Sequence, residues 1–520
     1  MLFHSLVFIG VFLPVTLLVF YLLAHGRSAR VPLYWLMVAS LIFYGYWNPP
    51  YVLLLLGSIG VNFLIGRALA RQPSRTLLVL GVAANLAVIG YYKYGNFFLG
   101  TIDTLAGTGW SLGQVFLPLG ISFFTFQQIA FLVDAHRGQA RTGSFADYAL
   151  FVSFFPQLIA GPIVHHGEVM PQFARRDAFR PQADNFALGL GIFTFGLIKK
   201  VLIADGVAVY ADPVFAAAQA GLAPTLFEAW GGALAYTFQL YFDFSGYSDM
   251  AIGLARMFNI RLPLNFDSPY KAVNIVDFWR RWNMTLSRFL RDYLYIPLGG
   301  SRRGRVRRYI NLMITMLLGG LWHGAGWTFV VWGGLHGLYL VVNHFWHALR
   351  RALGRDPDRS TALGRVFARA LTFLVVVVAW VPFRAESFDA SARLLAGMFG
   401  GNGIVVPEAY FRMLGPLGPL LAGAGVEFRY VPGFLFDGMP QAFWLAAVAA
   451  IAFLAPNTQQ WFGLAEWRRP RLAPALERLA APLLYWRAHP LQAIGMGGAF
   501  AVLLLMLYSE TPRAFLYFQF

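Results

Sequence analysis

The chain of 520 residues is 58% hydrophobic and 17% aromatic, and its mean hydropathy of +0.57 lies far above that of soluble proteins. Its formal net charge of +17 comes from short basic clusters between apolar runs, a distribution that favours anchoring to anionic lipid and argues against nucleic-acid binding. The chain has no cysteine, which excludes disulfides and a thioester-forming nucleophile of its own. These properties predict an all-α polytopic membrane protein.

Apolar runs predict the membrane spans in chain order. The first, at residues 6–24, lacks a basic leader and a small-residue cleavage site, so we expect a retained span and not a signal peptide. The basic residues Arg27 and Arg30 follow it, and positive charge prefers the cytoplasm, which places the N-terminus outside. Further runs lie at 32–47, 50–66, 76–92, 113–133, 186–209, 226–243, 365–382, 441–455 and 491–509. An even number of crossings then places the C-terminal tail outside as well.

Two regions depart from simple spans. Residues 148–163 are interrupted by Pro156 and by Gly161-Pro162, which favours a re-entrant element. Residues 309–349 are apolar and follow the highly basic stretch 244–308, which we expect to be cytoplasmic or interfacial. A second basic stretch comes after them, so they predict a hairpin that leaves from and returns to the inner side. Because no internal repeat is evident, one domain over 1–520 is the simplest description.

The run Leu-Gly-Gly-Leu-Trp-His-Gly-Ala-Gly-Trp at 318–327 lies in the first arm of this hairpin. It places His323 about 14 residues along the arm, about 21 Å deep at 1.5 Å per residue. An ionisable side chain at that depth is costly and is a functional candidate. The glycines of the run would let another helix or a substrate approach the ring. His323 could act as a general base, and the alternative is a buried histidine bonded to a backbone carbonyl.

Three further stretches carry a family resemblance. They are Tyr-Phe-Asp-Phe-Ser-Gly-Tyr-Ser-Asp at 241–249, Asp-Phe-Trp-Arg-Arg-Trp-Asn-Met-Thr-Leu-Ser at 277–287 and Phe-Pro-Gln-Leu-Ile-Ala-Gly-Pro at 155–162. With these motifs the core region 239–336 resembles the membrane-bound O-acyltransferase family, specifically its bacterial branch that acetylates cell-surface polysaccharides such as alginate. The resemblance implies a ring of transmembrane and re-entrant helices around a tunnel that joins two funnels, with His323 as the catalytic group.

One position departs from the pattern of that branch, whose members usually carry a histidine where this chain has Asn283. Other members of the wider family use asparagine with the downstream histidine, so the resemblance implies that Asn283 can act with His323. An amide can donate a hydrogen bond to a carbonyl oxygen as charge develops there. The alternative is an asparagine that caps a helix or bonds to backbone.

The motifs also supply candidates for substrate binding. These are Trp282, Trp322, Asp243, Ser245, Asp249 and His336. We expect Asp243 and Asp249 mainly to pair with Arg280, Arg281 or backbone, with direct substrate contact as the alternative.

The terminal sequence Phe-Leu-Tyr-Phe-Gln-Phe, within the aromatic tail 510–520, gives a further hypothesis. It looks like the aromatic tail of bacterial surface-acylation systems, including the small subunit of teichoic-acid D-alanylation, in which the tyrosine is thought to carry the acyl group. Because the chain has no cysteine, the phenol of Tyr517 is a reasonable nucleophile if a nearby base removes its proton. The alternative is an aromatic anchor at the membrane interface.

His165 and His166 could suggest a metal site, but adjacent side chains are expected to point apart and no third ligand is evident in the sequence. We therefore expect no metal and no bound cofactor.

The function predicted from these observations is an inner-membrane O-acetyltransferase with both termini periplasmic. The resemblance implies acetyl-CoA as the cytoplasmic donor, and a separate periplasmic transferase of the SGNH, or esterase, fold as the partner that modifies the polysaccharide. Two alternatives are a transporter or flippase for a polysaccharide precursor, and transfer of another acyl group such as D-alanyl. Against the transporter, we find none of the paired repeats that are common in that class.

Overall fold

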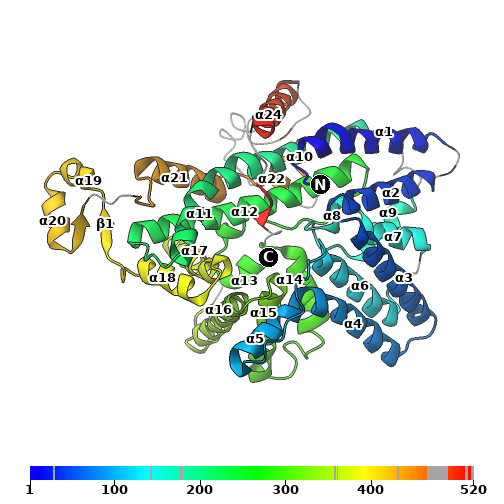
Figure 1. Ribbon diagram of the computed structural model, residues 1–520, viewed down its shortest axis with the longest axis horizontal. Coiled ribbons are helices and arrows are strands. Elements are labelled where there is room, and N and C mark those ends of the chain that lie inside the picture. The colour runs from blue at the N-terminus through cyan, green and yellow to red at the C-terminus, as the bar shows by residue number, and fades with distance from the viewer. Residues whose placement is uncertain are drawn as a thin grey trace.

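The protein is described by a computed structural model covering residues 1–26, 28, 30–140, 143–175, 180–356, 359, 361–429, 433–464, 486, 490–509 and 513–516. Within these ranges the regular structure is helical apart from one short parallel pair, β1 (Ile404–Val406) and β2 (Val426–Phe428). The predicted all-α class is therefore confirmed. Figure 1 shows the helices grouped around the centre of the molecule, where the segment 513–516 also lies.

The first part of the chain forms one side of the molecule (Figure 1). Its helices are η1 (Phe8–Phe12), α1 (Leu13–Ala24), α2 (Val31–Gly45), α3 (Pro50–Arg71), α4 (Arg75–Ile89), η2 (Gly90–Tyr94), α5 (Gly95–Ala106), α6 (Ile121–His136), α7 (Phe145–Ser153), α8 (Phe155–Leu158) and α9 (His166–Phe173). The central helices follow. They are α10 (Ala183–Leu197), η4 (Ile198–Ala204), α11 (Asp205–Gln219) and α12 (Leu226–Met257).

The remaining elements carry the second half of the core motifs and the C-terminal helices. They are η5 (Pro269–Lys271), α13 (Ile275–Trp279), α14 (Met284–Leu290), η6 (Arg291–Tyr295), α15 (Arg305–His323), α16 (Trp327–Ala352), α17 (Ala362–Arg384), α18 (Phe388–Met398), α19 (Glu408–Met413), α20 (Leu417–Gly423), α21 (Met439–Leu454), α22 (Thr458–Trp461) and α24 (Pro490–Ser509).

Several helices are long and apolar enough to cross a membrane, which confirms a multi-pass membrane protein. By length and composition five segments of the described chain qualify, namely Pro50–Arg71, Arg75–Ala106, Ala183–Gln219, Ala362–Arg384 and Pro490–Ser509. Shorter apolar helices occur at Phe8–Ala24, Val31–Gly45 and Met439–Leu454. The predicted span at 76–92 ends too early, because the helix continues through η2 and α5 to Ala106.

Two predicted spans are core helices. Helix α6 begins at Ile121 and not near residue 113, and nearly all of its side chains are buried by other helices. Helix α12 does not end at residue 243 but runs on to Met257, again buried almost throughout. The predicted boundary at Phe244 is therefore wrong. The reason is that apolar and small residues continue through the polar motif at 241–249, so the helix keeps a face that others can cover.

Small residues let α10 and its continuation η4 lie directly against α12. A Cβ atom on Gly196 would stand 2.6 Å from the carbonyl oxygen of Gly246, so neither position has room for a side chain. Such close approach between helices is typical of membrane proteins, where packing and polar contacts replace the hydrophobic effect. It turns Lys199 and Lys200 of η4 toward the polar motif of α12.

A pair of helices joined by a turn is confirmed here, since α15 and α16 pack together across residues 324–326, while the side of the membrane from which they leave stays a prediction. Gly320 allows the contact: a Cβ atom there would stand 2.2 Å from the carbonyl oxygen of Phe329 in the other arm. At this position the glycine admits a helix, and not a substrate. The predicted interruption at 148–163 is also present, because α7 ends at Ser153 and the short α8 begins at Phe155, followed by non-helical backbone.

Candidate active site

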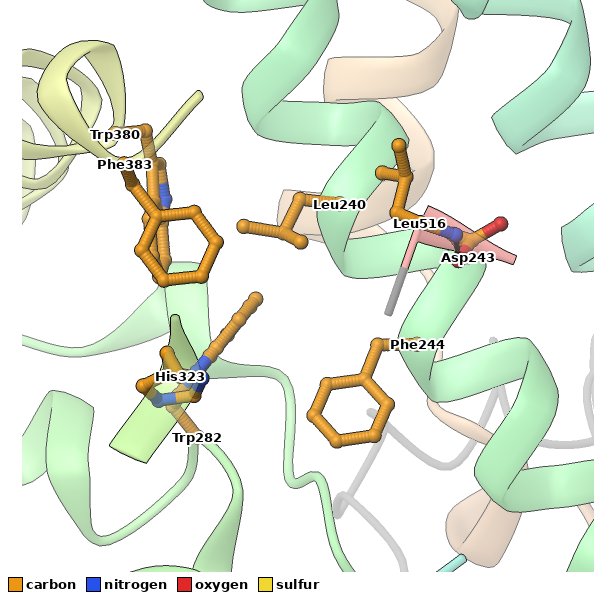
Figure 2. A pocket seen from close by; sticks show the side chains of 8 residues that line it. All are labelled: Leu240, Asp243, Phe244, Trp282, His323, Trp380, Phe383 and Leu516. Atoms are coloured by element: carbon orange, nitrogen blue, oxygen red, sulfur yellow. Dashed lines mark hydrogen bonds between the residues drawn. The ribbon is translucent and has the colours of Figure 1, made fainter. Parts of the chain in front are cut away.

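His323 lines a small cavity at the centre of the molecule. The cavity has a volume of about 10 Å³, room for about one water molecule. Figure 2 shows the side chains around it, which come from α12, α17, the α13–α14 loop, the end of α15 and the C-terminal segment. They are Leu240, Asp243, Phe244, Trp282, His323, Trp380, Phe383 and Leu516. Apart from Asp243 and the imidazole, this lining is largely apolar.

His323 is the last residue of α15 and is 4% exposed. Three aromatic rings surround its imidazole with their centroids 4.9 Å (Trp322), 5.1 Å (Trp332) and 5.3 Å (Phe383) away, each at a steep angle to it. These rings exclude water from the flanks of the imidazole, while the cavity remains beside it. An imidazole in this position can accept a proton from a hydroxyl group in a site where water would not compete as acceptor.

A second, much larger cavity of about 870 Å³ lies on the other side of the α13–α14 loop. Four arginines line it, namely Arg280, Arg288, Arg291 and Arg308, with Ser301 and His344 near the same rim. Their charges are not equally available. Arg288 is held by Glu168 through two contacts of 2.5 and 2.9 Å, whereas Arg308 donates to Nδ1 of His344 at 2.6 Å. Because the acceptor is a histidine and not a carboxylate, this contact does not neutralise the positive charge of Arg308.

The segment 282–284 separates the two cavities. Trp282 lines the small one and Met284 lines the large one. Asn283 between them is 2% exposed and has a left-handed backbone with φ of 42°, a conformation that asparagine tolerates better than most residues. Its side chain makes no capping hydrogen bond to α14, and Nδ2 has no hydrogen-bond partner in the described part of the chain. Asn283 itself lines neither cavity, so its amide is a buried donor between two residues that do.

The predicted arginine partners of the two aspartates in α12 are wrong, whereas the predicted backbone partner is present for Asp243, which accepts from the N–H of Leu516. Asp243 accepts from Lys200 Nζ at 2.8 Å, and Asp249 accepts from Lys199 Nζ at 2.6 Å. Arg281 instead contacts Asp277 and Asp267. The physical reason is the glycine contact between α10 and α12, which brings η4 alongside these carboxylates, while Arg281 lies beyond the end of α12.

The C-terminal segment is attached to the same place. The backbone N–H of Leu516 donates to Oδ2 of Asp243 at 3.0 Å, and Lys200 reaches the carbonyl oxygen of Ala514 at 3.4 Å. The Phe515 ring packs edge-on against Tyr247, with centroids 4.6 Å apart. Leu516 enters the small cavity. Tyr517, the predicted acyl carrier, lies outside the described residues.

The other candidates for substrate binding line neither of these cavities. Trp322 packs against Phe123 and Phe126, away from the small cavity. Ser245 is 1% exposed within α12, and its hydroxyl has no hydrogen-bond partner among the described residues. His336 is fully buried behind Trp332, with ring centroids 4.7 Å apart.

The expectation that His165 and His166 point apart, with no third group near, is wrong. His165 Nε2 lies 3.5 Å and His166 Nδ1 lies 3.6 Å from the same oxygen of Asp134, because α6 and α9 meet here. Tyr293 donates to that oxygen at 2.7 Å. The Tyr293 hydroxyl also contacts Nε2 of His165, so it lies between that ring and the carboxylate. That pattern fits a hydrogen-bonded cluster better than a metal ligand.

Sequence reasoning missed the lysines of η4 and the aromatic pair Trp380 and Phe383 of α17. The lysines carried a usable signal, since two adjacent ammonium groups inside the apolar run 186–209 demand partners. The aromatic pair carried none, because tryptophan and phenylalanine in an apolar helix are ordinary until the fold brings them to a cavity.

The comparisons with known proteins identify the family of the chain. A model of the family described as "MBOAT, membrane-bound O-acyltransferase family" matches residues 136–379, which include the polar motifs and His323. The chain is 45% identical over 435 residues to a peptidoglycan O-acetyltransferase of Helicobacter pylori, covering 78% of this chain and 81% of that protein. It is 44% identical over 411 residues to a protein of Pseudomonas putida named as a probable alginate O-acetylase, AlgI, covering 77% of this chain and 80% of that one.

A more distant similarity extends to a teichoic acid D-alanyltransferase of Streptococcus thermophilus, 28% identical over 257 residues, with 46% of this chain and 60% of that protein covered. Three findings lead to the same conclusion. The chain covers most of the two O-acetylating relatives, the family match includes the polar motifs, and the fold is helical and multi-pass. The chain belongs to the membrane-bound O-acyltransferase family and is an O-acyltransferase.

Proposed function

We propose that this protein takes an acetyl group from acetyl-CoA at the cytoplasmic face of a bacterial inner membrane and delivers it toward hydroxyl groups of an extracytoplasmic polysaccharide. Acetyl transfer is supported by the names of the two similar relatives, an O-acetyltransferase of peptidoglycan and a probable O-acetylase of alginate. The observation that carries the proposal is that His323 and the C-terminal Leu516 line one cavity, with a basic cavity behind the wall at Trp282.

The large cavity suits the donor. Its arginines provide positive charge for the phosphate groups of coenzyme A. Arg280 and Arg308 are the best placed, because no carboxylate is bonded to either among the described contacts, whereas Arg288 and Arg291 are paired. The thioester end would then approach the segment 282–284. Asn283 there has an amide Nδ2 available to donate to the thioester carbonyl oxygen as negative charge develops on it.

In the chemical step, His323 removes the proton from an attacking hydroxyl group, and the oxygen of that hydroxyl bonds to the acetyl carbon. The bond between that carbon and the sulfur of the donor breaks, and the thiolate leaves. The imidazolium returns its proton to the thiolate, so the products are an acetyl ester and free coenzyme A. The aromatic wall around His323 keeps water from taking the place of the acceptor.

The first acceptor in this proposal is the phenol of Tyr517. Leu516 is fixed in the cavity of His323 by its bond to Asp243, and Tyr517 is the next residue. The acetyl ester on the phenol would pass to a serine of a separate periplasmic transferase of the esterase fold, and from there to the polysaccharide. An ester of a phenol is a better acyl donor than an ester of a sugar hydroxyl, so the second transfer is downhill.

The proposed location of both termini on the periplasmic side has support from a contact between them. Nε2 of His4 is 2.9 Å from the carbonyl oxygen of Arg513, and its ring packs edge-on against Phe515 at 4.7 Å. The first residues of the chain and the described C-terminal segment are therefore neighbours, which supports placing both on one side of the membrane. The basic inner loops favour the other face as the cytoplasmic one.

The test uses purified full-length protein with acetyl-CoA labelled in the acetyl group. We expect thiol release, and label retained on the C-terminal peptide as seen by mass spectrometry. Both should fall at least about 1,000-fold in His323→Ala, since a general base and its position are lost together. Tyr517→Phe should abolish the label on the peptide. Unchanged thiol release in His323→Ala contradicts the role of the histidine, and label on the Tyr517→Phe peptide contradicts the carrier.

The same experiment separates the alternatives. A transporter or flippase would release no thiol and retain no label. Transfer of D-alanyl is favoured only by the distant relative, and the lack of turnover with acetyl-CoA but turnover with a D-alanyl thioester would support it.

A further inference from the structure

The helix that carries His323 is followed by a glycine, but this glycine does not adopt the left-handed conformation that caps a helix. Gly324 follows it with an extended backbone, φ of −155° and ψ of 149°, so the chain does not fold back to bond the last carbonyl groups. The last turn of an α-helix leaves its carbonyl oxygens without intrahelical donors. In the membrane interior, where water is scarce, those oxygens need donors from elsewhere.

The donors come from a different membrane-spanning segment. Nζ of Lys93 donates to the carbonyl oxygens of Trp322 at 2.7 Å and of His323 at 3.1 Å. The neighbouring Tyr94 hydroxyl donates to the carbonyl oxygen of Leu321 at 2.9 Å. Two consecutive side chains thus bond the last three carbonyl groups of α15.

The position of Lys93 in its own helix is unusual. It lies in η2, a π-helical stretch inside the long apolar helix Arg75–Ala106, and π-helical turns are frequent at functional sites. An ammonium group within an apolar span is costly and is usually retained for a role. Its positive charge also faces the end of α15, where the helix dipole is negative. Its third contact is the hydroxyl of Ser122, at 3.5 Å.

We propose that Lys93 is a positioning residue for His323, an inference that rests on the proposed role of His323 as the base. By bonding the carbonyl groups on both sides of the 322–323 peptide link, Lys93 fixes the backbone from which the imidazole projects. The three aromatic rings around His323 then hold a single ring orientation toward the cavity. Without Lys93 the end of α15 would lose two hydrogen bonds at the catalytic residue and the ring would move relative to the cavity.

The experiment compares Lys93→Met with Lys93→Arg and with the control Tyr94→Phe, using thiol release from acetyl-CoA with the periplasmic transferase and its polysaccharide present, so that the acetyl group moves on and the enzyme turns over. Lys93→Met keeps an unbranched apolar side chain and removes the donor and the charge. We expect its kcat to fall about 100-fold, as misplacement of about 1 Å can cause, with KM for acetyl-CoA within about threefold. Lys93→Arg should recover most of kcat. Tyr94→Phe removes the donor one residue earlier in the helix and should keep kcat within about twofold, since it leaves the 322–323 link bonded.

The outcomes separate this inference from the proposed function. A wild-type kcat in Lys93→Met beside an inactive His323→Ala overturns the role of Lys93 alone, and full activity in His323→Ala overturns the proposed function. A fall in kcat/KM caused by KM alone also overturns the inference, because donor binding would then be at stake. If Lys93→Met does not fold, Lys93→Leu, which also lacks a donor, takes its place with the same expected loss. Failure of both to fold, with wild-type kcat in Lys93→Arg, would assign Lys93 to folding only and overturn the inference.

Discussion

The backbone N–H of Leu516 donates a 3.0 Å hydrogen bond to Oδ2 of Asp243, whose other oxygen accepts from Lys200 at 2.8 Å. One carboxylate therefore joins the C-terminal segment to two central helices, η4 and α12. Both of its oxygens are used as acceptors, and the site of the bond is the cavity that contains His323. The position of the segment 513–516 is set by a buried ion pair and not by loose contact with the surface.

The first prediction concerns this bond. Asp243→Asn replaces one of the two acceptor oxygens by an NH2 donor, so either Leu516 loses its hydrogen bond or Lys200 keeps only Asp205 as a carboxylate partner. We expect acetylation of the C-terminal peptide to fall at least about tenfold and stability to fall by about 1–3 kcal/mol. Mass spectrometry of that peptide and thermal unfolding check the two effects.

The matched control is Asp249→Asn, which changes the neighbouring lysine pair in the same helix without touching the tail. It should lower the melting temperature but keep acetylation of the peptide within about twofold. Equal loss of acetylation in both variants would show that the effect of Asp243 is general destabilisation.

The second prediction concerns the basic cavity. Arg308→Gln removes a positive charge from its lining, and a hydrogen bond to a charged group contributes about 1.5–3 kcal/mol, so KM for acetyl-CoA should rise about tenfold or more with kcat little changed. The KM for acetyl-pantetheine, which lacks the phosphates, should not change. Arg302→Gln, an exposed arginine of the same basic cluster that does not line the cavity, is the control. Equal rises for both donors would argue against phosphate binding at Arg308.

The third prediction concerns the size of the acyl group. The cavity at His323 holds about 10 Å³, so the lining should limit the enzyme to short acyl chains. Phe244→Leu removes part of that lining and should raise turnover of butyryl-CoA relative to acetyl-CoA about tenfold, since one or two methylenes of fit change selectivity by about 1–3 kcal/mol. Phe238→Leu is the control, because Phe238 is buried in the same helix and packs on Phe373 instead. A similar change in both variants would exclude the cavity as the cause.

The fourth prediction concerns pH. Burial lowers the pKa of His166 below its ordinary value of 6.5, and Asp134 opposes this shift only in part. Since the folded protein then binds fewer protons than the unfolded chain, this contribution to stability is present above about pH 6.5 and is lost as the pH falls. His166→Gln should flatten the decline of the melting temperature between about pH 7 and 5. An unchanged slope in this variant, with the exposed His25→Gln as reference, would contradict the prediction.

The fold class, most helices and the position of His323 near the end of a hairpin arm could be predicted from the sequence. Apolar runs between basic clusters are a local signal, so the hairpin of α15 and α16 and the break after Ser153 were found at the expected places. Span boundaries were less accurate. Helix α12 continues past Phe244 because other helices cover it. The local sequence does not show which segments other helices will cover.

The candidate site, too, could be predicted only in part from the sequence. The residue types in the motifs and their resemblance to the family identified the imidazole, the asparagine and the two aspartates. The arginine partners of those aspartates were predicted incorrectly. The contact of Lys200 with Asp243 depends on glycines that let two helices approach closely, and these two residues are 43 positions apart in the sequence. The cluster at Asp134, His165 and His166 was missed for the same reason.

The sequence by itself determined that this chain lies in a membrane, which family it resembles, and which ionisable groups an apolar environment would make costly. These properties depend on composition and on short motifs, so the residue types in each local segment are enough to reveal them. Only the tertiary structure decided which groups meet: that Lys93 bonds the end of the helix of His323, that Leu516 enters the cavity beside it, and that an arginine-lined space lies behind the wall at Trp282. These contacts join segments hundreds of residues apart, and they depend on how whole helices pack together.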